Sequence, residues 1–208
     1  MGIEVDIEKK LGDFELKISF KHENDFLALS GPSGAGKSLT LKCIAGIDTP
    51  DSGKIILNER VLFDSEKKIN LKPQDRMVGL LFQDYALFPN MTVWQNIEIA
   101  NRNNVDIKDF LEKFKLSGLE KLYPYQLSGG QKQRCAMARM LITNPELVML
   151  DEPFNSLDEK LKGELMDEVK GLIMRLNKPA IIVSHNETEI KFFTDNVISI
   201  NKSERSIN

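Results

Sequence analysis

Apolar and polar residues alternate strictly at the beginning of the chain. Every second residue is apolar over residues 3–8 and again over residues 14–20. A period of two is typical of strands that bury one face. Because Leu11-Gly12-Asp13 separates the two runs with a turn-forming glycine, the pattern predicts a β-hairpin with one buried face.

Short, uninterrupted apolar runs then alternate with helical patterns. Such runs are typical of strands covered on both faces, and their alternation with helices predicts a parallel sheet with helices on both sides. The stretch from residue 58 to Pro73 is polar, and no element is assigned to it. The predicted strands are residues 26–29, 54–57, 77–82, 147–150, 180–183 and 197–200, and the predicted helices are residues 39–45, 92–100, 106–114, 132–141, 159–177 and 186–194.

One long segment, between residues 84 and 144, lacks any strand pattern. It contains two helical patterns, which Thr92 and Asp106 can cap. We therefore predict an α/β fold in a single domain with two parts. Residues 1–83 and 146–208 would form the core, a mostly parallel sheet flanked by helices with an antiparallel β subdomain, and residues 84–145 an inserted helical subdomain.

Composition and charge exclude several classes of protein. The 208 residues carry a net charge of −3 and the isoelectric point is near 5.6, which gives no support for a nucleic-acid-binding face. No apolar run approaches the roughly 18 residues of a membrane span, and the N-terminus lacks the pattern of a signal peptide. Cys43 and Cys135 fall in helical patterns and are predicted to be buried free thiols. We expect a cytoplasmic protein that associates with a membrane only through a partner.

Residues 31–38, Gly-Pro-Ser-Gly-Ala-Gly-Lys-Ser, match the phosphate-binding pattern G-x-x-x-x-G-K-[ST] without a mismatch. The motif lies between a predicted strand and a predicted helix, where its glycines allow successive N–H groups to surround an anion at a helix N-terminus. Lys37 would reach the β- and γ-phosphates, and the Ser38 hydroxyl would bind Mg²⁺. This is the pattern of a P-loop NTPase core.

Polar residues follow three other predicted strands. Since ligands bind beyond the carboxyl ends of parallel strands, Gln83, Asp151 and His185 should lie on the same rim as the phosphate loop. Asp151 could hold Mg²⁺, and Glu152 could activate a water for attack on the γ-phosphate. His185 could donate a hydrogen bond to the γ-phosphate, and Gln83 could bridge Mg²⁺ or the attacking water to the helical segment. The alternatives are a turn or helix cap for the two carboxylates and a structural role for His185.

Residues 128–131, Ser-Gly-Gly-Gln, form a second glycine-rich helix start and thus a second candidate anion site. In isolation the segment could equally be an ordinary helix start. One chain would have two phosphate-binding elements but one Lys37 and one pair of rim carboxylates. Two copies packed head to tail about a two-fold axis would use all of them, with each ATP between the phosphate loop of one copy and the Ser128 segment of the other.

Together, these motifs resemble those of ATP-binding cassette (ABC) proteins, the motor subunits of membrane transporters, over essentially the whole chain. Residues 127–131 resemble the family signature, residues 147–152 the Walker B strand with its catalytic glutamate, and residues 155–158 the D-loop. The implied catalytic residues are Glu152, His185 and Gln83, the implied Mg²⁺ ligands are Ser38, Gln83 and Asp151, and the implied ATP contacts are Phe14, Gly31, Pro32, Ser33, Gly34, Ala35, Gly36, Lys37, Ser38, Leu39, Ser128, Gly129, Gly130 and Gln131.

The resemblance also implies partners and a location. The chain would hydrolyse ATP as a homodimer at the cytoplasmic face of the cell membrane, attached to integral permease subunits and acting indirectly with a substrate-binding protein. The stretch 85–89 and the helical segment would receive the permease. Residues 10–14, 60–64 and 71–73 are similar to those of molybdate-importer ATPases, and importers of sulfate and other oxyanions are close relatives.

Three features depart from the family pattern. Phe14 stands where many relatives have tyrosine, so it could stack on the nucleotide base or serve only as a core or edge aromatic. Asn155 replaces the usual serine of the D-loop, so contacts between subunits could differ there. The chain ends at Asn208 without additional C-terminal helices, and we expect no regulation by a bound oxyanion.

Two other functions fit the phosphate loop. One is a soluble ABC-type ATPase that acts on nucleic acid or the ribosome, but no long coiled coil separates the phosphate loop from the signature, the chain carries one cassette, and it is acidic. The other is a nucleotide-binding module without hydrolysis, which the presence of Lys37, Asp151 and Glu152 disfavours.

Overall fold

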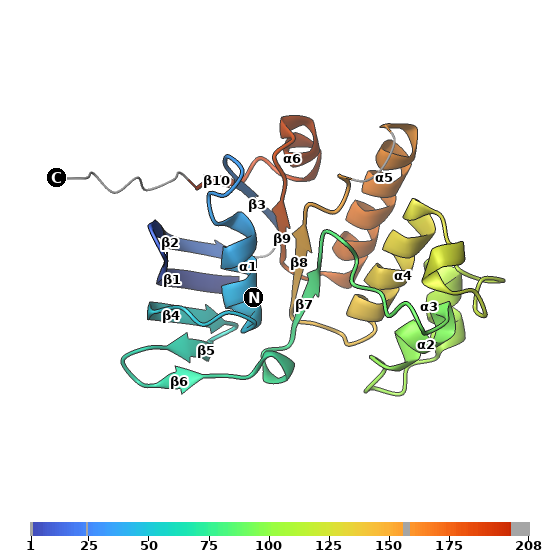
Figure 1. Cartoon of the computed structure of the whole chain (residues 1–208), viewed down its shortest axis with the longest axis horizontal. Helices are drawn as coiled ribbons and strands as arrows, with labels where there is room; N and C mark the ends of the chain where they lie inside the picture. The colour runs from blue at the N-terminus through green and yellow to red at the C-terminus, as the bar shows by residue number, and fades with distance from the viewer. Residues whose placement is uncertain (1, 24, 156–158, 201–208) are drawn as a thin grey trace.

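The computed structural model describes residues 2–23, 25–155 and 159–200, and their strands form two sheets (Figure 1). One sheet is antiparallel, with the order β2-β1-β4-β5-β6, and the other is parallel, with the order β10-β3-β9-β8-β7. The strands are β1 (Gly2–Leu11), β2 (Phe14–Glu23), β3 (Phe26–Ser30), β4 (Ser52–Leu57), β5 (Arg60–Asp64), β6 (Ile69–Asn70), β7 (Val78–Leu81), β8 (Leu147–Asp151), β9 (Ala180–Val183) and β10 (Val197–Ser199).

The predicted hairpin is confirmed as β1 and β2. The two strands pair along their whole length, from Gly2 opposite Glu23 to Leu11 opposite Phe14. β4 adds to the other side of β1, so the hairpin starts the antiparallel sheet. Its alternate apolar side chains are buried, as the period of two predicted.

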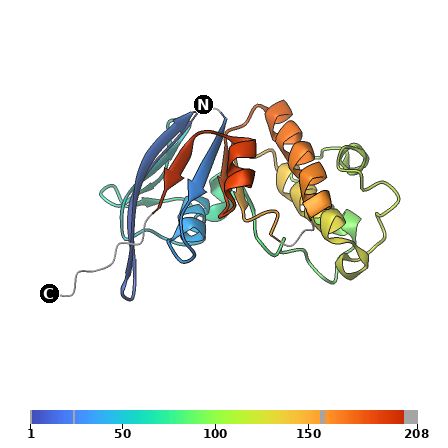
Figure 2. The same cartoon turned by 90° about the horizontal axis from the view of Figure 1, so that it is seen from above.

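Helix α1 (Lys37–Ala45) lies between the two sheets (Figures 1 and 2). Its residues Leu41 and Ile44 belong to the same apolar core as Val5 of the antiparallel sheet and Leu29 and Met149 of the parallel sheet. Because α1 begins where the phosphate loop ends, this core holds the loop at the carboxyl end of β3.

The other face of the parallel sheet is covered by helices α4 (Gly129–Leu141), α5 (Glu159–Leu176) and α6 (Glu187–Phe193) (Figure 2). Alternate residues of β3 divide between the two cores: Leu27 and Leu29 face α1, and Phe26 and Ala28 face the helical side. The strand is thus covered on both faces, and the predicted α/β fold class is confirmed.

Residues 84–145 contain helices and no strand, as their pattern predicted. The helices here are α2 (Val93–Glu98), α3 (Ile107–Lys113) and α4, and the short 3₁₀ turn η2 (Pro124–Gln126) precedes α4. Thr92 caps α2 with a capping box, and the Asp106 side chain caps α3.

The polar stretch 58–73, to which the sequence assigned no element, contains β5 and β6 and leads into the 3₁₀ turn η1 (Pro73–Asp75). β5 pairs with β4 and buries Leu62 and Phe63 in the core between the sheets. The apolar part of β5 is only three residues long, between Arg60 and Asp64, so the strand depends on its neighbour rather than on a pattern of its own.

Candidate functional site

The phosphate loop connects β3 to α1 in the conformation that its glycines allow. Gly36, the residue before α1, has a φ of 98°, and a Cβ there would lie 2.9 Å from Leu16 Cδ1 and 3.0 Å from Phe14 Cζ. Glycine is required both by the left-handed backbone and by the close approach of these side chains. The ring of Phe14 therefore lies directly against the loop.

The Lys37 ammonium is held within the loop. Its side chain is buried, and Nζ donates hydrogen bonds to the carbonyl oxygens of Gly31 (2.8 Å) and Pro32 (3.0 Å). These bonds keep a buried positive charge next to the N-terminus of α1. The helix dipole and the ammonium both favour an anion here.

The side chains of Ser38 and Asp151 are in contact although 113 positions separate them in the sequence. Ser38 Oγ donates to Asp151 Oδ1 at 2.8 Å. Asp151 ends the buried strand β8 and is 7% exposed. Burial raises the pKa of the Asp151 carboxyl group, and the Ser38 hydrogen bond partly opposes this effect. A hydroxyl and a carboxylate oxygen side by side are the hard oxygen donors that Mg²⁺ prefers, so these residues fit that ion.

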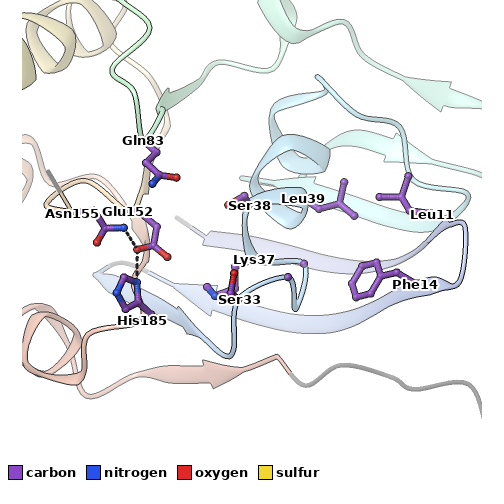
Figure 3. A pocket seen from close by; sticks show the side chains of 12 residues that line it. Leu11, Phe14, Ser33, Lys37, Ser38, Leu39, Gln83, Glu152, Asn155 and His185 are labelled. Carbon is purple, nitrogen blue, oxygen red and sulfur yellow. Dashed lines mark hydrogen bonds and ion pairs between the residues drawn. The ribbon is translucent and has the colours of Figure 1, made fainter.

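Glu152 lies at the centre of a polar cluster at the same rim (Figure 3). Its Oε2 accepts hydrogen bonds from Asn155 Nδ2 at 2.6 Å and from His185 Nδ1 at 2.7 Å. The backbone of Glu152 has a φ of 47°, which is strained for a residue with a side chain. The Glu152 N–H donates to the carbonyl oxygen of Val183, so β9 holds this turn in place.

A cavity of about 570 Å³ joins the phosphate loop to the polar cluster. Asp151 does not line it but bonds to Ser38, which does. Phe14 and Leu11 from the β1–β2 hairpin form one apolar end, and Gln83, Glu152 and His185 form the opposite end (Figure 3). The residues that line the cavity are Leu11, Phe14, Ser33, Gly34, Gly36, Lys37, Ser38, Leu39, Gln83, Glu152, Asn155 and His185.

Sequence reasoning missed part of this site. Leu11 was assigned only to a turn, and the hydrogen bond from Asn155 to Glu152 was not foreseen. The expectation that Asn155 changes contacts between subunits stays a prediction, and residues 156–158 of the predicted D-loop lie outside the described residues.

The Ser128 segment does not line this cavity. Ser128 caps α4 instead: its Oγ accepts from the N–H of Gln131, and Gln131 Oε1 accepts from the N–H of Ser128. The capping box fixes the start of the helix, where Ser128 and Gly129 are exposed and Gly130 is buried. Within one chain, the two predicted phosphate-binding elements therefore remain separate.

Strand, phosphate loop, helix and rim carboxylates define a P-loop nucleotide-binding domain. A family model described as ABC transporter matches residues 15–155, and the chain belongs to this family. In the part of the chain that the structure describes, no helix has the length and apolar character to cross a membrane.

Named relatives cover nearly the whole chain. ModC of Aliivibrio fischeri, a molybdenum import ATP-binding protein, is 37% identical over 98% of this chain and 57% of its own length. WtpC of Archaeoglobus fulgidus, a molybdate/tungstate import ATP-binding protein, is 38% identical over 95% of this chain and 82% of its own length. Import ATP-binding proteins for sulfate/thiosulfate and trehalose/maltose are similar at 35–40% identity. The chain thus spans little more than half the length of several curated relatives that it matches.

A solved structure shares the fold. The dimeric post-hydrolysis state of the ATP-binding cassette MJ0796, bound to ADP and Pi, superposes with a TM-score of 0.78 at 25% identity. The match covers 98% of this chain and 97% of the other. This agreement confirms the fold class for the described residues.

Proposed function

We propose that the chain is the ATP-hydrolysing subunit of an ABC importer. The observation that carries the proposal is the single cavity that contains a phosphate loop at one side and Glu152 with His185 at the other. An apolar end beside Phe14 suits a nucleotide base, and the loop suits its phosphates. ATP is the ligand that matches this order of apolar, cationic and acidic groups.

The residues around the cavity would have different roles in ATP hydrolysis. Lys37 and the loop N–H groups bind the phosphates and stabilise the charge that develops on them. Ser38, Asp151 and Gln83 would hold Mg²⁺, which supplies charge neutralisation at the phosphate oxygens when bound. Glu152 orients a water and accepts its proton.

Before the reaction, the side chains of His185 and Glu152 are hydrogen-bonded to each other. A carboxylate only accepts hydrogen bonds, so His185 Nδ1 carries the proton in their contact, and a neutral imidazole then has no N–H at Nε2. For Nε2 to donate to a γ-phosphate, either the ring must be protonated or the contact with Glu152 must break. The second route also frees Glu152 for the attacking water, so arrival of the γ-phosphate would release both groups together.

A second copy of the chain would complete the site. The Ser128 helix start lies outside the cavity of its own chain and is fixed by its capping box, and it would serve as the second anion site. In a head-to-tail dimer it would close over ATP bound to the partner's phosphate loop. The similar cassette MJ0796, which is dimeric in its structure with ADP and Pi, supports the assembly of two copies.

The permease would dock on a groove beside the Gln83 loop, which would place the chain at the cytoplasmic face of the membrane. This groove, of about 610 Å³, includes the exposed side chains of Met77, Phe88 and Ile99. Exposed apolar patches of this kind are typical of interfaces. Buried Asn96 bonds to the N–H and carbonyl of Phe88 and to the carbonyl of Met91, which fixes the loop that presents the patch.

Molybdate or a related oxyanion is the proposed transported substrate. Molybdenum and molybdate/tungstate import proteins are among the most similar relatives, although sulfate and sugar importers are similar too. The complex should be reconstituted with its permease, and hydrolysis compared with molybdate-loaded and sulfate-loaded binding protein. Stronger stimulation by sulfate would contradict the assignment.

The ATPase proposal is tested with Glu152→Gln. This variant keeps the shape of the side chain but cannot accept a proton, so it should bind Mg-ATP, stop turnover and accumulate as a dimer in gel filtration. Wild-type protein with Mg-ADP is the control and should remain monomeric. A variant that stays monomeric at every ATP concentration would count against the composite site, and one that hydrolyses ATP at the wild-type rate would remove Glu152 as the base.

A further inference from the structure

His185 is held by one side-chain contact and by the backbone of a short connection. It lies in the short connection between β9 and α6, and its side chain is 61% exposed. Among the described residues, its side chain makes one polar contact, from Nδ1 to Glu152. If that contact breaks when nucleotide binds, only the connection itself keeps the ring aimed at the cavity.

The hydroxyl of Ser184 stabilises this connection with two hydrogen bonds. Its side chain is fully buried, and its Oγ accepts a hydrogen bond from the N–H of Asn186 at 3.0 Å. The same Oγ donates to Glu189 Oε2 at 2.7 Å. Ser184 and Asn186 flank His185, so one hydroxyl bridges the backbone on both sides of the histidine.

Glu189 connects the Ser184 hydroxyl to helices α6 and α5. Its carboxylate lies in α6, is 2% exposed, and forms an ion pair with Lys162 Nζ at 2.9 Å. Lys162 belongs to the first turn of α5 and also contacts Glu159 at 3.4 Å. A buried carboxylate is costly unless it is paired. Here Oε2 accepts the Ser184 hydrogen bond, and Oε1 accepts no hydrogen bond from the described residues but lies beside the Lys162 charge.

We propose that Ser184 and Glu189 are positioning residues for ATP hydrolysis: the buried chain Lys162–Glu189–Ser184 holds His185 on the rim and ties it to the start of α5. This inference rests on the proposed function, because it assigns a purpose to the orientation of His185. Neither residue lines the cavity, so both act through His185 and not on ATP.

The first test separates kcat from KM. Ser184→Ala removes the hydroxyl and should lower kcat at least tenfold, since small misplacements of a catalytic group have effects of about that size or more. KM for ATP should change less than about twofold, because the phosphate loop is untouched. Ser184→Thr keeps the hydroxyl and should restore most of kcat.

A matched control exists in the antiparallel sheet. The Ser65 hydroxyl likewise accepts from one backbone N–H, that of Gly53, and donates to the carbonyl oxygen of the same residue. Ser65→Ala therefore also removes two hydrogen bonds, far from the cavity, and should leave kcat within about twofold of wild type. An equal loss of kcat in Ser65→Ala and Ser184→Ala would show a general effect of stability and would overturn the proposal.

The second test does not depend on hydrolysis. The chain has two histidines, so ¹³Cε1-labelled histidine gives one NMR signal from His22 and one from His185, which His185→Gln assigns. Ser184→Ala should shift the His185 signal and leave that of His22 unchanged. An unshifted His185 signal in Ser184→Ala, together with a shifted one in Glu152→Gln, would overturn the proposal.

The outcomes distinguish the two proposals. Absence of ATP hydrolysis by wild-type protein would reject the proposed function, while the NMR measurement would still decide whether Ser184 positions His185. Wild-type hydrolysis with normal kcat in Ser184→Ala would reject the positioning role alone. Should Ser184→Ala fail to fold, Glu189→Gln replaces it, because it keeps the side-chain shape but loses the charge paired with Lys162; the same loss of kcat and shift of the signal are expected.

Discussion

Arg76 is the largest fully buried side chain of the described residues. Two of its partners, the carbonyl oxygens of Cys43 and Ile44, belong to the last turn of α1, where a cation is favoured by the helix dipole. Its guanidinium donates at 2.7 Å to Cys43 O, 2.9 Å to Ile44 O, 2.9 Å to Leu71 O and 2.7 Å to Asn70 Oδ1. Arg76 thus connects the helix of the phosphate loop to the antiparallel sheet.

We expect Arg76→Met to lower the free energy of unfolding by about 3 kcal/mol. Four hydrogen bonds from a charged donor contribute roughly 1.5 kcal/mol each, about 6 kcal/mol together. Removing the charge also removes its desolvation cost, which in buried sites amounts to several kcal/mol and offsets about half of that sum. Methionine fills most of the volume of the arginine stem, so a large cavity does not form.

Urea denaturation followed by circular dichroism measures this change. For a chain of this size, 3 kcal/mol corresponds to a fall in Tm of about 6–12 °C. Arg102→Met is the matched control, because Arg102 is exposed and its replacement should change the free energy of unfolding by less than about 0.5 kcal/mol. A similarly small change in Arg76→Met would refute the reasoning, since it would mean that the four carbonyl and amide oxygens find other partners at no cost.

Three further predictions follow from the cavity and the cores. Lys37 is the one Lys or Arg among the cavity-lining residues described, so Lys37→Ala should lose most ATP affinity in calorimetry; unchanged binding would remove the central assignment. Phe14→Ala should weaken ATP binding several-fold through lost aromatic contact but leave binding of tripolyphosphate unchanged, and equal losses would indicate a packing role. Burial raises the pKa of Cys43 to about 11 and of Cys135 to about 12. Both should therefore resist a thiol reagent at about pH 8 unless the protein is unfolded, and their contribution to stability, present below the unfolded pKa, should be lost as pH rises toward 11.

Local patterns predicted most of the fold. The period of two over residues 3–8 and 14–20 was sufficient for the hairpin, because each strand depends on burying one face. Continuous apolar runs located β3, β8 and β9, since strands covered on both faces need no polar positions. β5 and β6 were missed because their stability comes from pairing with β4 and with each other, which is not visible in a window of five residues.

The site was predicted as a set of residues but not as a set of contacts. The rule that ligands bind beyond the carboxyl ends of parallel strands placed Gln83, Glu152 and His185 near the phosphate loop. It could not show that Lys37 bonds to the loop's own carbonyl oxygens or that Asn155 contacts Glu152. These contacts depend on side-chain rotamers and on pairs distant in sequence, for which one sequence contains no signal.

The arrangement of β8 beside β9 sets the geometry of hydrolysis. Asp151 pairs with Val183 in the sheet, and the N–H of Glu152 donates to the carbonyl oxygen of Val183. His185 follows Val183 by two residues, so one stretch of backbone carries the histidine and also anchors the strained turn that presents Glu152. Strain of this kind costs about 1–3 kcal/mol and persists only where the surroundings enforce it. The enforcing bond belongs to β9, and for this reason a change that loosens the connection after β9, such as Ser184→Ala, should disturb Glu152 and His185 together rather than the histidine alone.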